Sequence, residues 1–254
     1  MIVGLNVVKR RVKSLFVAVI LITLMYLVIN AVLFVFLDYP KSYRDMELDD
    51  FEPPVWNKKH IDNVTSLNSS FYKSGNFTFE GKILSYRLFK YISEYVKGIP
   101  LYIDGIMISS NFSEKRGALL FIHGYNSSWS DKYLFLKYIA LYSRFHIFAI
   151  DLPGAGNSSK MIRMTPEYFI NTENSYEDSY LYHASLSIMR AITLISNLSC
   201  VDSSDITICG ESLGGILSFI VGTMDNRVNR VIPIVAAGGF LSLIDKPSAL
   251  HLLV

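Results

Sequence analysis

Apolar residues along the chain follow two patterns, one typical of buried strands and one typical of helices. Short apolar runs at 117–122, 146–150, 206–209 and 230–236 predict buried strands. Apolar residues at helical spacing predict helices over 129–145, over 175–198 and from 213 onward. Strands that alternate with helices are typical of a parallel sheet covered on both faces. The pattern therefore predicts an α/β domain with a mostly parallel sheet.

Upstream of these elements, the pattern predicts strands joined by a tight turn. The apolar positions from Phe77 to Phe89 predict a first strand. Two further runs, 101–103 and 106–108, flank Asp104-Gly105, a dipeptide favoured in two-residue hairpin loops. We therefore expect the folded domain to begin near Asn76 and a hairpin to turn at Asp104-Gly105.

A different pattern, an unbroken apolar stretch, covers Ser14–Leu37. It contains no charged residue and no polar face, and its length exceeds the roughly 20 residues that span a bilayer core. A basic cluster at 9–13 precedes it and Asp38 follows it, which favours a cytoplasmic N-terminus and an exported remainder. The alternative is a cleaved signal peptide, but its apolar region is normally shorter and no small-x-small cleavage pattern follows.

The predicted organisation has three parts. Residues 1–38 form a cytoplasmic basic tip and a single-pass membrane anchor. Residues 39–75, with three prolines, an acidic patch and a Ser/Asn-rich piece, are typical of a juxtamembrane linker. Residues 76–254 form the α/β domain, which we expect on the extracytoplasmic side of the membrane.

Potential glycosylation sequences give independent support for export. The Asn-x-Ser/Thr sequence occurs seven times, where chance would give roughly two. The alternative explanation is a composition rich in serine and asparagine. All seven lie beyond the apolar stretch, starting at Asn63, Asn68, Asn76, Asn111, Asn126, Asn157 and Asn197.

The composition argues against several classes of function. The 254 residues, 51% of them hydrophobic, suffice for one core and an appendage, and the anchor explains much of the positive mean hydropathy of +0.32. A net charge of +2 without a basic, aromatic-rich patch argues against nucleic acid binding. Five scattered histidines and two cysteines form neither a metal-ligand spacing nor a disulfide framework. We expect no metal and no cofactor.

The segment with the clearest chemistry is Gly210-Glu211-Ser212-Leu213-Gly214. It is a G-x-S-x-G pattern, and it lies between a predicted strand and a predicted helix, the context in which that pattern forms a nucleophile elbow. A sharp turn there would hold the Ser212 hydroxyl clear of the sheet. The Leu213 N–H, at the helix start, would stabilise a developing oxyanion. The alternative is an ordinary glycine-rich turn.

The domain resembles the α/β-hydrolase superfamily over about residues 76–239. Three segments occur in the superfamily's order: His123-Gly124-Tyr125, the loop 151–158, and 210–215. The Ser-x-Gly-Gly sequence and the segment 224–231 look most like the branch of acetyl xylan esterases, dienelactone hydrolases and prolyl-oligopeptidase-like proteins.

The resemblance implies a serine hydrolase that cleaves an ester or peptide-like acyl bond. Ser212 would be the nucleophile, and the N–H groups of Leu213 and Tyr125 would form the oxyanion hole. It also implies that His123 is structural and that Asp151 shapes the loop after its strand. An acyl substrate and the membrane are the expected partners.

The catalytic acid and base are the part of the resemblance that fits least well. The superfamily order is serine, acid, histidine, and after Ser212 the only later histidine is His251, with Asp245 as a possible acid. These two residues are weak candidates, because no intervening strand would bring His251 back over Ser212. We expect a hydrolase domain that is incomplete at its C-terminus.

Two functions therefore remain open. The first is a membrane-anchored extracytoplasmic serine hydrolase. The second is a non-catalytic hydrolase-like ectodomain, or truncated pseudoenzyme, with a binding or structural role. Fold resemblance alone does not decide between them.

Overall fold

The computed structural model describes residues 58–162, 164–169 and 175–236. The predicted anchor, most of the linker, and the candidates Asp245 and His251 lie outside these residues. Within the described ranges, no helix combines the length and the apolar character needed to cross a bilayer.

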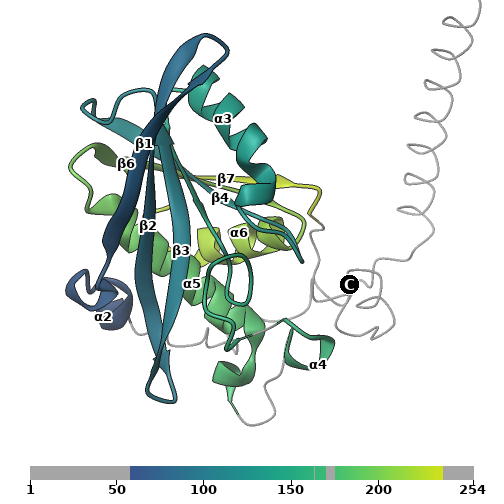
Figure 1. The fold of residues 1–254 in the computed structure, drawn as a ribbon. Coiled ribbons are helices and arrows are strands. Elements are labelled where there is room, and N and C mark those ends of the chain that lie inside the picture. Colours follow the sequence, from purple (N-terminus) through teal and green to yellow (C-terminus); the bar gives the residue numbers. More distant parts are fainter. Residues whose placement is uncertain (1–57, 163, 170–174, 237–254) are drawn as a thin grey trace, which may run out of the picture. The chain divides into compact units, whose positions relative to one another are not determined.

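A seven-stranded mixed sheet forms the centre of the described part (Figure 1). The spatial order is β1-β2-β3-β5-β4-β6-β7. Neighbours from β1 to β5 pair antiparallel, and β5, β4, β6 and β7 pair parallel. The mostly parallel sheet expected from the sequence is thus parallel in its second half only. The strands are β1 (Ser70–Phe79), β2 (Lys82–Val96), β3 (Ile99–Ser109), β4 (Arg116–Ile122), β5 (His146–Ile150), β6 (Val201–Glu211) and β7 (Arg230–Ile234).

Two tight turns account for the antiparallel half. Glu80-Gly81 joins β1 to β2, with φ values of 48° and 74°, and Lys97-Gly98 joins β2 to β3, with φ values of 50° and 79°. Positive φ at both positions is the signature of the two-residue hairpin loop, and so short a loop can join only antiparallel strands. The single strand expected from Phe77 to Phe89 is therefore two strands.

The hairpin expected at Asp104-Gly105 is wrong. Both residues lie in the middle of β3, and Asp104 is 1% exposed. Gly105 is opposite Phe89 on β2, and a Cβ atom at Gly105 would lie 2.4 Å from Cζ of Phe89. The glycine thus makes room for a ring packed across the sheet. Asp104 accepts a hydrogen bond from the Tyr72 hydroxyl at 2.6 Å, so tertiary contacts, not turn geometry, explain this dipeptide.

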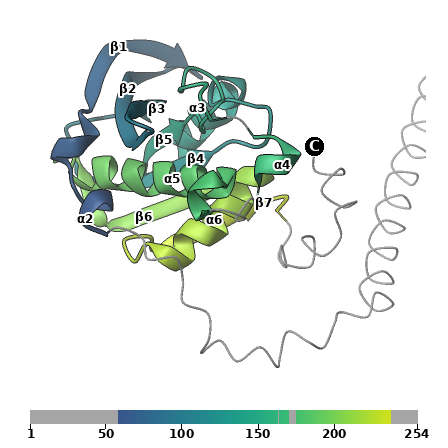
Figure 2. The ribbon, with the colours of Figure 1, turned by 90° about the horizontal axis from the view of Figure 1, so that it is seen from below.

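Helices cover both faces of the sheet (Figure 2). The long helix α5 and the helix α6 lie against one face, and α3 lies against the other. These three correspond to the helices predicted from the periodicity, with shorter bounds. The helical segments are α2 (Lys58–Ile61), η3 (Thr65–Leu67), η4 (Ser130–Lys132), α3 (Tyr133–Tyr142), α4 (Pro166–Phe169), η5 (Tyr176–Asp178), α5 (Tyr180–Ser196) and α6 (Leu213–Met224).

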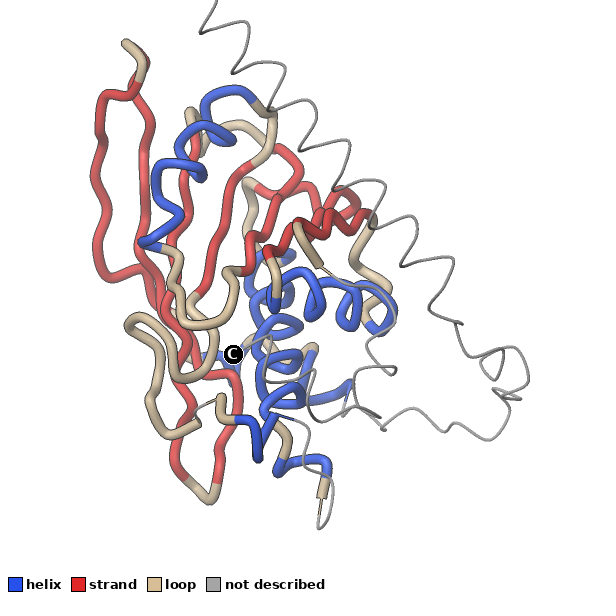
Figure 3. The backbone as a smooth tube through the Cα atoms, turned by 90° about the vertical axis from the view of Figure 1, so that its right-hand side faces the viewer, coloured by secondary structure: helices blue, strands red, loops and turns tan. Residues whose placement is uncertain are grey.

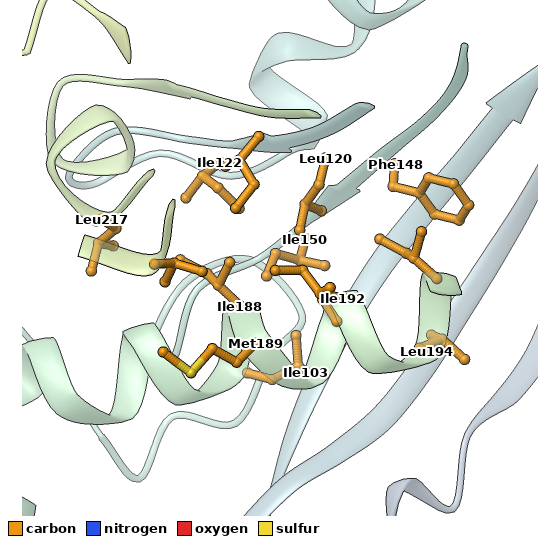
Figure 4. Close-up of a cluster of buried hydrophobic side chains, with 14 of the residues drawn as sticks. Ile103, Leu120, Ile122, Phe148, Ile150, Ile188, Met189, Ile192, Leu194 and Leu217 are labelled. Atoms are coloured by element: carbon orange, nitrogen blue, oxygen red, sulfur yellow. The ribbon is translucent and has the colours of Figure 1, made fainter. Parts of the chain in front are cut away.

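The larger of two buried clusters fills the space between the sheet and α5 (Figure 4). Ile188 and Ile192 of α5 face Leu120 and Ile150 of the central strands, and all four are fully buried. Burial of such side chains contributes about 1.5–3 kcal/mol each. This packing holds β4, β5 and β6 as a rigid platform, and their carboxyl ends carry the loops described next.

The folded part begins earlier than the expected Asn76, because the segment 58–67 is fixed to α5 by Arg190. This side chain is fully buried, and its guanidinium donates hydrogen bonds to backbone and hydroxyl oxygens of that segment. The Thr193 hydroxyl adds a bond to Ile61 O at 2.7 Å. The Arg190 acceptors are His60 O at 2.7 Å, Ile61 O at 2.9 Å, Asn63 O at 2.8 Å and Ser66 Oγ at 2.8 Å. The predicted linker is correspondingly shorter on its C-terminal side.

Candidate active site

Ser212 occupies the turn between β6 and α6 in a backbone conformation that L-residues rarely adopt. Its φ is 52° and its ψ is −116°. The Ser212 N–H donates to Ile234 O of β7 at 2.9 Å, and its carbonyl accepts from the Gly215 and Ile216 N–H groups at 2.9 and 3.1 Å. Strain of this kind persists only where the surroundings enforce it, and it is typical of active sites. The turn is the sharp strand-to-helix bend that the G-x-S-x-G pattern predicts.

The glycines on either side of Ser212 allow this turn. A Cβ atom at Gly210 would lie 2.0 Å from Gly214 O, and one at Gly214 would lie 2.2 Å from Ile122 O. Neither position has room for a methyl group, because backbone atoms fill the space. The spacing of the pattern therefore lets α6 start directly against the ends of β4 and β6.

The loop after β4 lies beside this elbow. Ile122 at the end of β4 pairs with Gly210 of the parallel neighbour β6, so the two chain segments leave the sheet at the same edge. A Cβ atom at Gly124 would lie 3.4 Å from Cβ of Ser212. The structure thus places His123-Gly124-Tyr125 next to the predicted nucleophile.

Tyr125 and Leu213 line one cavity of about 410 Å³. Among the described residues, no hydrogen bond joins either N–H group to an acceptor. The cavity lies between the loop after β4, the loop after β5 and the start of α6. It is lined by residues 123–128, Asp131, residues 152–156, Met164, Tyr180 and Leu213.

His123 is held by both ring nitrogens and is 2% exposed. The Leu152 N–H donates to Nε2 at 3.0 Å, so Nε2 is the acceptor nitrogen and Nδ1 carries the proton that is donated to Gly124 O at 2.7 Å. Burial lowers the pKa of His123 below its ordinary value, which favours this neutral form. Its contacts are those of a residue that shapes the loop, as the resemblance implies, and they leave no nitrogen for Ser212.

Asp151 connects the two loops that frame the cavity. Its carboxylate accepts hydrogen bonds from the Trp129 N–H at 2.9 Å and from the Asn157 N–H at 2.8 Å. Burial raises its pKa, and the two N–H donors oppose that shift. The Ser158 hydroxyl donates to Asp151 O at 2.7 Å. These contacts support the loop-shaping role expected of Asp151.

Two charged residues that the sequence reasoning missed fix the loop after β4. Lys132 Nζ lies 2.6 Å from Glu211 Oε2 and links η4 to the residue before the nucleophile. Asp131 Oδ2 accepts from the N–H and hydroxyl of Ser128 at 2.8 and 2.9 Å. The only signal in the sequence was their position at the start of a predicted helix. Glu211 is the ion-pair partner of Lys132 and is partly exposed.

None of the four histidines in the described ranges is placed as a base for Ser212. His60 Nε2 bonds Ser93 O at 3.0 Å, and His146 Nδ1 bonds the Ser109 hydroxyl at 2.8 Å. His183 pairs with Glu94 through Nδ1 at 2.7 Å. Within these ranges the loop 123–125 lies beside the elbow. The candidates Asp245 and His251 are outside them.

The fold is similar to that of known esterases. No curated protein matches the sequence. Among solved structures, an acetyl xylan esterase from Paenibacillus sp. R4 matches with a TM-score of 0.57 at 19% identity, over 78% of this chain and 64% of that one. Acetyl xylan esterase 1 from Thermoanaerobacterium sp. JW/SL YS485 matches with a TM-score of 0.54 at 21% identity, over 74% of this chain and 63% of that one.

At these identities the structural matches show a shared fold, and the chain spans less than two thirds of either relative. The family model described as acetyl xylan esterase (AXE1) matches residues 37–246, which is most of the chain. The protein therefore belongs to the acetyl xylan esterase (AXE1) family of α/β-hydrolases.

Proposed function

We propose that this chain carries the nucleophile and the oxyanion hole of a serine esterase that removes acyl groups from ester substrates. The observation that carries the proposal is the strained turn at Ser212 beside a cavity lined by Tyr125 and Leu213. Membership of the AXE1 family supports acetyl esters of a polysaccharide such as xylan as the substrate class.

The reaction follows from this arrangement. The Ser212 hydroxyl attacks the ester carbonyl, a general base takes its proton, and the carbonyl oxygen becomes an oxyanion that accepts hydrogen bonds from the Tyr125 and Leu213 N–H groups. The C–O bond to the alcohol then breaks, and the same proton passes to the departing oxygen. Water releases the acid from the acyl-enzyme by the same steps. For the base and its carboxylate partner, this sequence offers His251 and Asp245.

We also propose that Ser14–Leu37 anchors the domain on the extracytoplasmic side of a membrane. The support is the uncharged 24-residue stretch, the basic cluster before it and the excess of glycosylation sequences after it. The asparagines of all seven sequences lie at exposed or half-buried positions, and one of them, Asn126, also lines the cavity.

A non-catalytic hydrolase-like domain is the second candidate. The observation that favours it is the engagement of the described histidines with partners other than Ser212. A serine without a base is a poor nucleophile, so such a chain would keep the cavity and lose the reaction.

Ester hydrolysis by the full chain and by Ser212→Ala separates these functions. We expect the full chain in detergent to release acetate from p-nitrophenyl acetate and from acetylated xylan, and the variant to lose at least about 10³-fold in kcat/KM. Equal rates for a folded wild type and a folded variant would overturn the esterase proposal and leave the non-catalytic function. Extraction of native membranes with alkaline carbonate tests the anchor separately, since an anchored chain stays in the pellet.

A further inference from the structure

The outer face of α3 is apolar where a surface helix normally carries charges. Leu136 and Ala140 point inward and are buried, yet Leu134, Tyr138 and Tyr142, at spacings of four residues, are 57%, 42% and 75% exposed. Surface helices usually show charged or polar side chains on the face away from the core. Here α3 is apolar on both sides.

Aromatic contacts extend this surface onto β1. Phe79 meets the Tyr138 ring edge-on with centroids 4.9 Å apart, and the Tyr138 and Tyr142 rings stack with centroids 6.3 Å apart. Phe135, 41% exposed, completes the set. We call Leu134, Phe135, Tyr138, Tyr142 and Phe79 the α3 face. A contiguous exposed apolar surface of this kind marks an interaction site more often than a single exposed residue does.

The charges on α3 and directly after it are positive, whereas Glu80 follows Phe79 on the β1 side of the α3 face. Lys137 is the one charged residue within α3, and its Nζ lies 4.7 Å from the centroid of the Phe79 ring and 4.8 Å from that of Tyr133. Arg144 follows the helix, and no carboxylate occurs from Tyr133 to Arg144. Tyrosine and lysine side chains at the edge of an apolar surface are typical of the boundary between hydrocarbon and headgroups.

We propose that the α3 face lies on the surface of the bilayer that holds Ser14–Leu37. This inference rests on the anchor proposed above. At no more than about 3.6 Å per residue, residues 38–57, between the apolar stretch and the first described residue, limit the domain to within about 70 Å of the bilayer. Such tethering gives an effective concentration on the order of millimolar, so a small face with weak intrinsic affinity suffices. The positive charge favours anionic headgroups.

Docking through α3 would also fix the orientation of the cavity. The helix follows directly on the loop 123–128 that lines it. A domain held by this face would therefore keep its cavity in one orientation relative to the bilayer.

An environment-sensitive fluorophore on a single cysteine tests the proposal. The fluorophore is attached to the full chain at Tyr142→Cys. Cys200 is replaced by serine so that it is not labelled, and Cys209 is kept because it is buried. The labelled chain is reconstituted in vesicles of phosphatidylcholine and phosphatidylglycerol, with or without doxyl lipids. The matched control is Tyr95→Cys, which is 60% exposed near the β2–β3 hairpin. That hairpin lies at the opposite end of the sheet from α3 (Figures 1 and 3).

We expect doxyl lipids to quench the probe at position 142 at least about threefold more strongly than the probe at position 95. Adding Leu134→Ser and Tyr138→Ser should remove most of that difference, whereas adding Ile99→Ser, 58% exposed on the control hairpin, should leave it unchanged. Both sets alter exposed side chains, so folding is retained in both.

Three results would overturn the proposal, and they differ from one another. If the chain binds vesicles but doxyl lipids quench the probes at positions 142 and 95 equally, the chain is anchored and the α3 face does not dock. If the chain does not co-sediment with vesicles, both the anchor and the docking of the α3 face are contradicted. If the probe at position 142 becomes less exposed to solvent in detergent as the protein concentration rises, a second copy of the chain, not lipid, covers the α3 face.

Discussion

Lys132 Nζ and Glu211 Oε2 lie 2.6 Å apart, and this ion pair joins the loop that carries one predicted oxyanion donor to the elbow that carries the other. Glu211 directly precedes Ser212, and Lys132 ends the short helix η4 that follows the cavity loop. Both side chains are partly exposed, at 28% and 34%. The pair is therefore suited to setting the spacing of two loops more than to stabilising the fold.

We expect Lys132→Ala to reduce kcat by about 3- to 10-fold and to change KM less. In the proposed mechanism the amides of Tyr125 and Leu213 stabilise charge that develops only in the transition state. The free energy of unfolding should fall by no more than about 1 kcal/mol. Steady-state kinetics and urea denaturation on the same preparations check both statements. We expect the double variant Lys132→Glu with Glu211→Lys, which exchanges the two charges, to recover kcat. An unchanged kcat in Lys132→Ala would refute the positioning role.

Gly214→Ala should prevent the elbow from forming. The added methyl group would lie 2.2 Å from Ile122 O, a backbone atom that cannot move without displacing β4. We expect a loss of at least about 3 kcal/mol in the free energy of unfolding, or failure to fold. Gly98→Asn is the matched control, because that turn position has a positive φ of 79° and open space around it. Denaturation midpoints that coincide for the two variants would contradict this packing.

The His183–Glu94 pair predicts a specific pH dependence of stability. Burial acts to lower the pKa of His183, but the hydrogen bond and charge of Glu94 outweigh it and the pKa is raised above 6.5. A raised pKa in the folded state gives stability that is fully present below pH 6.5 and is lost as the pH rises through the folded value. The difference in unfolding free energy between wild type and His183→Gln should therefore shrink from pH 5.5 to pH 8. A constant or growing difference would show that the charged pair does not form.

Arg190 should matter for stability despite having no carboxylate partner within hydrogen-bond distance among the described residues. Its guanidinium donates to three carbonyl oxygens of the segment 58–67, and Arg190→Leu would remove these three hydrogen bonds from a buried site. We expect a loss of about 3 kcal/mol in urea denaturation, together with faster proteolysis within 58–67. Lys115→Ala, at an exposed position, serves as the control. Wild-type protease resistance in Arg190→Leu would mean that other contacts hold the segment.

The parts of the fold that local pattern determines were predictable. β5 is buried throughout and apolar from Ile147 to Ile150, and the elbow has its fixed glycine spacing, so both were placed correctly from the sequence. The second oxyanion loop was placed through family order, because nothing within His123-Gly124-Tyr125 alone indicates its proximity to Ser212.

Features that depend on distant contacts were not predictable in this way. Asp104-Gly105 has the sequence of a hairpin, but the Phe89 ring and the Tyr72 hydroxyl favour a continuous strand. The segment 58–67 reads as linker because its fixing residue, Arg190, lies on a helix far along the chain. The Lys132–Glu211 pair likewise joins residues that only the sheet brings together.

Mapping the site of covalent modification tests the central claim most directly. The full chain is treated with a fluorophosphonate, digested and sequenced by mass spectrometry, with Ser212→Ala treated in parallel. We expect one adduct, on the peptide that contains Ser212, and none at that peptide in the variant. A folded wild-type chain that remains unmodified, or that carries its adduct on another residue, would contradict the assignment of Ser212 as the nucleophile.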